Sequence, residues 1–121
     1  MISSSCNDLK NQVRLFLREF KMAAEKGSGI IYAGRDKNWD TLVDLNMTSA
    51  MRNECVLGLT WRDYCQGPLA DERGQPGDLW VFGTNSGGCE IYIKLKLAQG
   101  ENAVCISFHK AEFSMEYPLG R

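Results

Sequence analysis

The sequence is poor in the residues that mark several common kinds of site. It has one histidine, His109, and no apolar run that approaches the ~20 residues of a membrane span. Its five cysteines include no CxxC pair and have no metal-like spacing to His109, so neither a disulfide framework nor a zinc site is supported. The first residues lack the basic and apolar succession of a secretory signal. We therefore expect a cytoplasmic protein with no metal, no cofactor and no membrane segment.

Neither sign of charge is in excess, because 14 basic and 15 acidic residues leave a formal net charge of -1. This balance argues against a strong long-range field, so any nucleic-acid binding must come from a local patch. The chain has 121 residues, of which 44% are hydrophobic, which is enough for one domain with a real core. We expect a single domain over residues 1–121.

The first half of the chain begins with a helical pattern. Ser5 can cap a helix that Gly27 and Gly29 bring to an end. Five apolar residues recur within it at helical spacing: Val13, Phe16, Leu17, Phe20 and Ala24. The next run, residues 30–33, is too short for a helix and rich in β-formers, so it predicts an isolated strand.

The middle of the chain contains shorter elements. Residues 35–38 are expected to form a charged turn, and two short helices follow, one around Leu42 and one capped by Thr48. Thr60 predicts a final helical turn before a proline-containing stretch in which a helix is unfavourable. Residues 67–78, with two prolines and three glycines among charged residues, resemble a linker between the two halves.

The second half alternates apolar and polar residues with a period of two in three runs. The turn-rich tetrads 85–88 and 99–102 separate these runs, which predicts an antiparallel meander. If each tetrad is a whole loop, Thr84 pairs with Cys89 and Ala98 pairs with Ala103. Nine apolar side chains then share one face: Trp80, Phe82, Ile91, Ile93, Leu95, Leu97, Val104, Ile106 and Phe108. The expected fold class is α+β, with the helices packed on that face of a small antiparallel sheet.

The opposite face of the meander gathers polar side chains. The same register sets Tyr92 across from His109, Lys94 across from Ser107, and Lys96 across from Cys105. A histidine can move a proton near neutral pH, and a lysine can stabilise negative charge developing on phosphate. This grouping predicts phosphodiester chemistry in which a ribose 2′-hydroxyl attacks its own phosphate, with His109, Tyr92 and Lys94 as catalytic residues.

Other residues of this face and of the charged turn are candidate RNA contacts: Arg35, Lys37, Lys96 and Ser107. The solvent face of any half-buried sheet is polar without being catalytic, so a non-enzymatic protein-binding module stays open as an alternative. A third interpretation, a cysteine-dependent enzyme, requires Cys105 or Cys89 close to His109.

Four segments of the last half resemble the motility quorum-sensing regulator (MqsR) family of toxins: Trp61-Arg62-Asp63-Tyr64, Leu79-Trp80-Val81-Phe82, Glu90-Ile91-Tyr92-Ile93-Lys94-Leu95 and Val104-Cys105-Ile106-Ser107-Phe108-His109. Members of that family are the ribonuclease halves of bacterial toxin-antitoxin pairs. The resemblance implies a RelE-like fold, metal-independent cleavage of messenger RNA and a protein antitoxin as partner.

The functional residues of that family carry over only in part. Its tyrosine and lysine, in a Tyr-hydrophobic-Lys strand, fall on Tyr92 and Lys94. The family's lysine after a Ser-Phe pair is replaced by His109, which can also transfer protons. Another lysine of the family falls near Gln66 and a glutamine falls on Val81, so both of these side chains are absent here.

Overall fold

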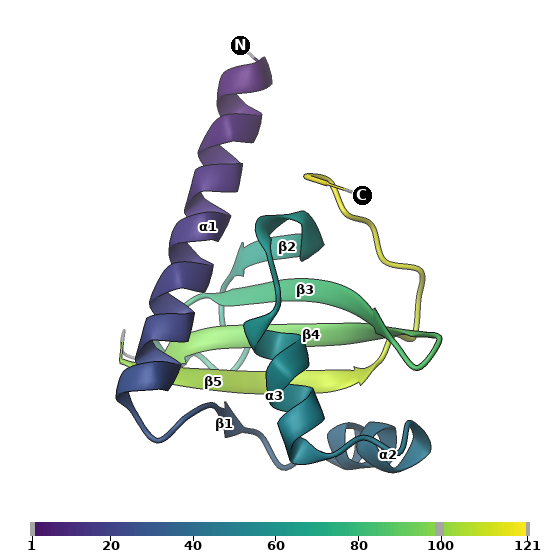
Figure 1. Cartoon of the computed structure of the whole chain (residues 1–121). Coiled ribbons are helices and arrows are strands. Elements are labelled where there is room, and N and C mark those ends of the chain that lie inside the picture. Colours follow the sequence, from purple (N-terminus) through teal and green to yellow (C-terminus); the bar gives the residue numbers. More distant parts are fainter. Residues whose placement is uncertain (1, 99–100, 121) are drawn as a thin grey trace.

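The computed structural model describes residues 2–98 and 101–120 and has helices on one side of a sheet (Figure 1). The elements are α1 Ile2–Lys26, β1 Ile31–Tyr32, α2 Asp36–Asp44, α3 Ser49–Leu57, the 3-10 turn η1 Trp61–Asp63, β2 Tyr64–Leu69, β3 Leu79–Ser86, β4 Cys89–Ala98 and β5 Asn102–Lys110. Within the described residues, five strands form one open sheet in the order β1-β5-β4-β3-β2. Strand β1 runs parallel to β5, and the other neighbours are antiparallel. The α+β class is confirmed, while the sheet is mixed and larger than the predicted meander.

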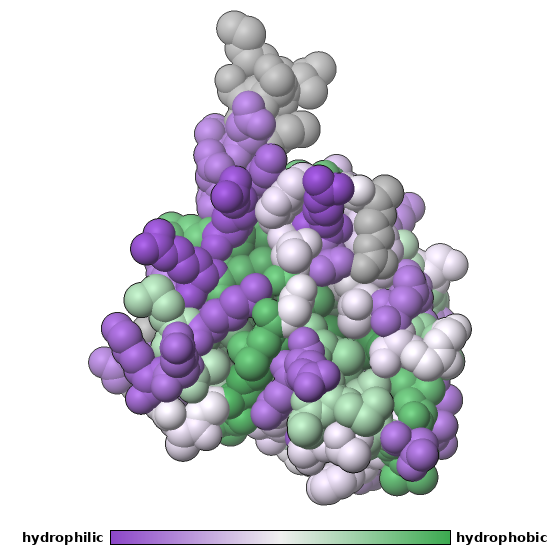
Figure 2. Space-filling view, in the orientation of Figure 1, coloured by the Kyte–Doolittle hydropathy of each residue, from purple (hydrophilic) through white to green (hydrophobic). Residues whose placement is uncertain are grey.

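Helix α1 covers the apolar face of the sheet, as its periodicity predicted (Figure 1). The rings of Phe16 and Trp80 stack with centroids 5.1 Å apart, which joins α1 to β3. Hydrophilic side chains cover the outward side of α1, and hydrophobic surface lies next to this helix (Figure 2). The helix begins at Ile2, so Ser5 lies inside it and not at its start. No helix among the described residues combines the length and the apolar character needed to cross a membrane.

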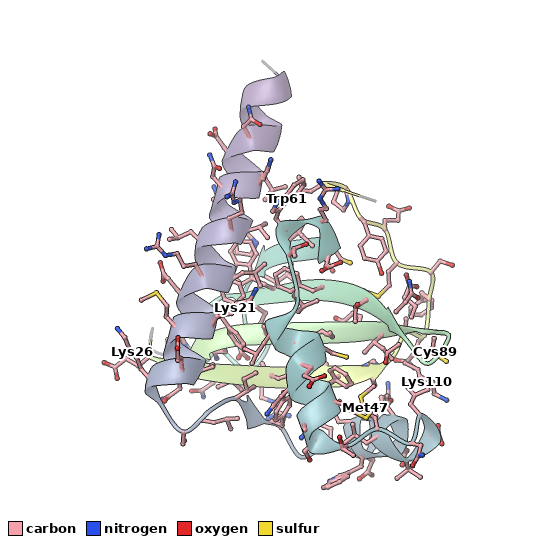
Figure 3. The ribbon with its side chains drawn as sticks, in the orientation of Figure 1. Lys21, Lys26, Met47, Trp61, Cys89 and Lys110 are labelled. Carbon is pink, nitrogen blue, oxygen red and sulfur yellow. The ribbon has the colours of Figure 1, made fainter. Side chains whose placement is uncertain are left out.

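The short helices and caps agree in part with the sequence pattern. Thr48 caps α3 by accepting a hydrogen bond from the backbone N–H of Met51, and Thr60 forms a capping box with Asp63 at η1. The predicted charged turn is wrong, because residues 36–38 already belong to α2. The Lys21 ammonium reaches from α1 to the chain between α3 and η1, where it donates to the carbonyl of Leu59 at 2.7 Å (Figure 3).

The β3–β4 turn is shorter than the predicted tetrad. Ser86 pairs with Cys89, which leaves a two-residue turn at residues 87–88, where both glycines have positive φ. Such turns match the twist of antiparallel strands and need residues that tolerate positive φ. Phe82 consequently lies opposite Ile93 and not Ile91. Because the register moves by two residues, every side chain keeps its predicted face.

A bulge in β5 changes the second hairpin. Tyr92 lies opposite His109 and Lys94 lies opposite Ser107, as predicted, but Leu95 pairs with Cys105 instead of Ile106. The extra residue in β5 reverses the alternation beyond it, so Lys96 faces Val104 and not Cys105. The loop residues 99–100 of the predicted tetrad lie outside the described residues.

The bulge moves Cys105 from the polar face, where it was predicted, to the buried face. Its side chain is 0% exposed in the core, and burial raises the pKa of the thiol to about 12. The cysteine-dependent interpretation placed Cys105 on the histidine face, which is wrong. Cys89, its other candidate, lies beside Lys110 at the turn end of the sheet (Figure 3) and does not line the hollow that contains His109.

The meander is flanked by two further strands, β1 and β2, which the sequence pattern did not place in the sheet. The predicted isolated strand is β1, which adds to β5 through Ile31 opposite Val104. Strand β2 occupies the start of the expected linker and pairs with β3. The linker is thereby reduced to residues 70–78, which fold back over the sheet.

Helix α2 seals the part of the β5 edge that β1 does not reach. The backbone N–H of Phe108 donates to Asn38 Oδ1 at 2.9 Å, and Asn38 Nδ2 donates to the carbonyl of Ile106 at 3.2 Å. The N–H of Lys110 donates to Thr41 Oγ1 at 3.0 Å. Both α2 side chains are buried, so they satisfy backbone groups that water does not reach. These bonds fix the end of β5 that carries His109.

Candidate functional site

A cleft of about 630 Å³ lies on the sheet face opposite α1. Strands β2 to β5 form its floor, and the segment that follows β5 forms one wall. Its lining consists of Arg35, Cys65, Gln66, Val81, Tyr92, Lys94, Ser107, His109 and residues 111–116. The cleft therefore brings together all three predicted catalytic residues, His109, Tyr92 and Lys94.

Residues 111–116 form the wall of the cleft. They belong to the segment 111–120, which leaves β5 and crosses the sheet (Figure 1, yellow) until Gly120 lies against Arg62 of η1. Glu90 anchors it, since one carboxylate oxygen accepts from the N–H of Met115 at 3.2 Å and the other from the hydroxyl of Tyr117 at 2.7 Å. Gly83 lies beneath the Tyr117 ring, where a Cβ atom would collide with the phenol. The segment can lie this close to the sheet because β3 has no side chain there.

Tyr92 and His109 form the centre of the site. Their rings stack across β4 and β5 with centroids 5.1 Å apart and planes 14° apart. His109 Nδ1 lies 2.9 Å from the carbonyl oxygen of Lys110. Because a carbonyl oxygen only accepts hydrogen bonds, this contact requires the hydrogen on Nδ1, and in the neutral imidazole the lone pair is then on Nε2. The contact with Lys110 thus favours the neutral tautomer in which Nε2 can accept a proton.

The phenol of Tyr92 is a hydrogen-bond donor at neutral pH. Burial raises its pKa, the nearby Cys65 and Glu72 add to the shift, and only Arg35 opposes it. The ammonium of Lys94 lies 5.8 Å from the centroid of the Tyr92 ring. A protonated phenol and a cation therefore lie beside the imidazole.

A second hollow, of about 480 Å³, extends the cleft beneath residues 70–78. Arg35 and Lys94 line both hollows, so they stand where the two meet. Arg35 is the residue just before α2, with an extended backbone. The two hollows together form a groove across the open face. Two cations lie at its middle, Arg35 from the N-terminus of α2 and Lys94 from β4.

The four predicted RNA contacts do not all reach this groove. Arg35 and Ser107 line it, and Ser107 is buried in its floor. Lys37 instead pairs with Glu112 at 2.8 Å, and this contact holds the pKa of the Glu112 carboxyl below its usual range.

Lys96 lies outside the cleft lining and is only 9% exposed. Its ammonium donates to Asp71 at 2.9 Å and lowers the pKa of that carboxyl. Lys96 thus holds residues 70–78 against the sheet, and its ammonium is already engaged.

Sequence reasoning missed the wall of the cleft. No sequence motif marks the residues of this wall that line the cleft, which include Glu112, Phe113, Met115 and Glu116. The one signal in the sequence is the alternation of the apolar residues Met115, Tyr117 and Leu119 with other residues. In the structure these three are partly buried and the residues between them are exposed. Such a pattern predicts an extended segment lying on a surface but does not say which surface.

Gln66 and Val81 also line the cleft. They are the two positions at which the resemblance described above implied that functional side chains are missing. Arg35 lines the same cleft and supplies a cation there.

Comparisons of the chain with protein-family models, with curated proteins and with solved structures give no match. Within residues 2–98 and 101–120, no three His, Cys, Asp or Glu side chains are grouped so as to hold a metal ion. The chemistry of the cleft and the sequence motifs are thus the basis for a functional argument.

Proposed function

We propose that the protein is a metal-independent endoribonuclease of the toxin type, which cleaves messenger RNA in the cytoplasm and is silenced by a protein antitoxin. One observation carries the proposal: His109, the sole histidine, shares an open cleft with Tyr92, Lys94 and Arg35. RNA cleavage without a metal requires a proton acceptor, a proton donor and cations for the phosphate, and this group contains each of them.

The reaction begins at the ribose 2′-hydroxyl beside the scissile phosphate. His109 Nε2 accepts the hydroxyl proton as the 2′-oxygen forms a bond to phosphorus. The bond from phosphorus to the 5′-oxygen breaks, and that oxygen takes a proton from the Tyr92 phenol. A 2′,3′-cyclic phosphate and a 5′-hydroxyl end result. The imidazolium later returns a proton to Tyr92 through solvent.

Tyr92 and the two cations support this chemistry in separate ways. The stacked Tyr92 ring orients the imidazole and stabilises its protonated form. Lys94 and Arg35, at the junction of the two hollows, stabilise the negative charge that grows on the phosphate oxygens.

The acidic residues of the wall do not cancel this positive charge. Lys37 neutralises Glu112 through their contact at 2.8 Å. Arg35 and Lys94 then stand against Glu116 in the cleft, and Arg73 stands against Glu72 in the second hollow, where Asp71 is paired with Lys96. The groove therefore has a local excess of positive charge. This is the local patch that a chain of near-zero net charge needs for binding a polyanion.

The proposal is tested with the purified protein and a single-stranded RNA in the presence of a metal chelator. We expect fragments with 2′,3′-cyclic phosphate and 5′-hydroxyl ends, detected by end-labelling with and without phosphatase. RNA that stays intact at high protein concentration, with the protein folded, argues against catalysis and favours the protein-binding module.

Replacing Lys94 with alanine is expected to lower the rate of RNA cleavage by roughly 10²-fold, as for loss of one charge-stabilising donor. Lys94→Arg keeps the positive charge and should recover part of the rate. Lys110→Ala is the matched control, because Lys110 lies on neighbouring β5, pairs with Asp44 at 2.8 Å and does not line the cleft. Single-turnover cleavage rates measure the effect. Equal rates for Lys94→Ala and Lys110→Ala would remove Lys94 from the mechanism.

A further inference from the structure

Phe113 is the most exposed large hydrophobic residue among the described part of the chain, at 85%. It belongs to the wall of the cleft, four residues after His109, and lines the same cleft. Its aromatic ring thus stands in solvent at the rim of a site that contains Arg35 and Lys94. A single exposed apolar side chain is common on protein surfaces, so its local support decides whether it has a role.

The backbone around Phe113 is held on both sides. Before it, the N–H of Ala111 donates to the carbonyl of Glu90 at 2.8 Å, and Glu112 pairs with Lys37. After it, the N–H of Met115 donates to the Glu90 carboxylate at 3.2 Å. The ring is therefore presented from an anchored loop, which reduces the conformational entropy that a ligand must remove on binding.

We propose that Phe113 is a base-stacking platform of the cleft, which receives the face of an unpaired nucleobase next to the phosphate held by Arg35 and Lys94. The inference rests on the proposed ribonuclease function and adds a nucleobase subsite to it. An exposed aromatic ring beside a cationic groove is the combination that single-stranded nucleic acids bind, because bases stack on the ring while the cations follow the backbone. In a duplex both faces of a base are already stacked, so this subsite selects single-stranded RNA.

Stacking on Phe113 contributes to affinity with little discrimination between bases, since every base has an aromatic face. The contribution is also insensitive to salt, because phenylalanine carries no charge and displaces no counterion. Both properties separate its role from the role of Arg35, whose loss is expected to reduce the salt dependence of binding.

The test uses His109→Ala as the parent, so that RNA is bound without being cut. Fluorescence anisotropy with labelled single-stranded oligoadenylate and oligouridylate gives the Kd of the parent and of three double variants. Adding Phe113→Ala should weaken binding of both RNAs roughly five- to hundredfold with an unchanged salt slope. Adding Phe113→Tyr should keep the affinity. The control is Trp39→Ala, another exposed aromatic, 63% exposed on α2 and outside the cleft lining, which should bind as the parent does.

Three results overturn the inference, and they are distinguishable. If the parent binds RNA and Phe113→Ala leaves Kd unchanged, the subsite is wrong while the ribonuclease proposal stands. If the parent and the wild type bind no RNA, the proposed function fails and the subsite fails with it. Loss of affinity in Phe113→Tyr as well as in Phe113→Ala also contradicts stacking, because a tyrosine ring stacks as phenylalanine does.

Discussion

Replacing His109 with alanine is expected to slow RNA cleavage by roughly 10²- to 10⁴-fold, the usual contribution of a positioned acid or base. The physical reason is the contact between Nδ1 and the carbonyl of Lys110, which leaves Nε2 of the neutral imidazole to accept the 2′-hydroxyl proton. Two measurements check it. Single-turnover rates report the chemistry, and induced expression in a bacterial host reports growth together with messenger RNA integrity. Wild type should arrest growth and fragment RNA, whereas the variant should do neither.

The control for His109 is Cys65→Ser, which changes a thiol that lines the same cleft. A serine keeps the size of the side chain, so cleavage should remain near the wild-type rate if the imidazole is the acting group. Alkylation is a poorer test, because a bulky adduct on Cys65 blocks the cleft whatever the mechanism. If Cys65→Ser loses cleavage and His109→Ala keeps it, the acting group is not the imidazole. The reaction would then depend on a cysteine, at Cys65 and not at Cys105.

Replacing Asn38 with alanine is expected to lower the free energy of unfolding by about 2–4 kcal/mol, since buried backbone groups lose their partners. The Asn38 amide makes three hydrogen bonds: it accepts from the N–H of Phe108 and donates to the carbonyls of Ala33 and Ile106. It thereby joins the start of α2 to the bulged part of β5. Urea denaturation followed by circular dichroism measures the loss.

Asn11→Ala is the matched control, because Asn11 is an exposed asparagine on α1 and its change should stay within ~0.5 kcal/mol. The Asn38 variant should also cleave RNA more slowly under conditions where it is folded. Its bonds flank Ser107 and fix the strand end that carries His109. An unfolding free energy equal to that of Asn11→Ala would show that the β5 edge is held by other contacts.

The central strands of the fold and the centre of the site follow from local alternation. Period-two runs specify which side chains share a face. Tyr92 lies opposite His109 as predicted because the extra residue at the β5 bulge offsets the one-residue shift nearer the turn, where Ala98 pairs with Asn102 and not Ala103. The buried face of α1 follows in the same way from helical spacing. In each case, the burial of apolar side chains on one surface of one element decides the arrangement.

The errors arise where backbone geometry or distant contacts decide. The turn at residues 87–88 is two residues long because both glycines accept positive φ, which alternation does not encode. The bulge in β5 reverses the faces of Val104 and Cys105 without interrupting the run of β-formers. Strand β2 contains a glycine and a proline and forms at the edge of the sheet, where proline is tolerated.

The sequence by itself determined an α+β fold, the covering helix, and the placing of Tyr92, Lys94 and His109 on one face of a meander. Only the tertiary structure decided that Arg35 joins them, that Lys37 and Lys96 are engaged with Glu112 and Asp71, and that residues 111–116 wall the cleft. Faces are set by neighbours two to four positions apart, which a local pattern contains. The cleft is set by segments far apart in the chain, whose contacts exist only after the sheet and helices have packed.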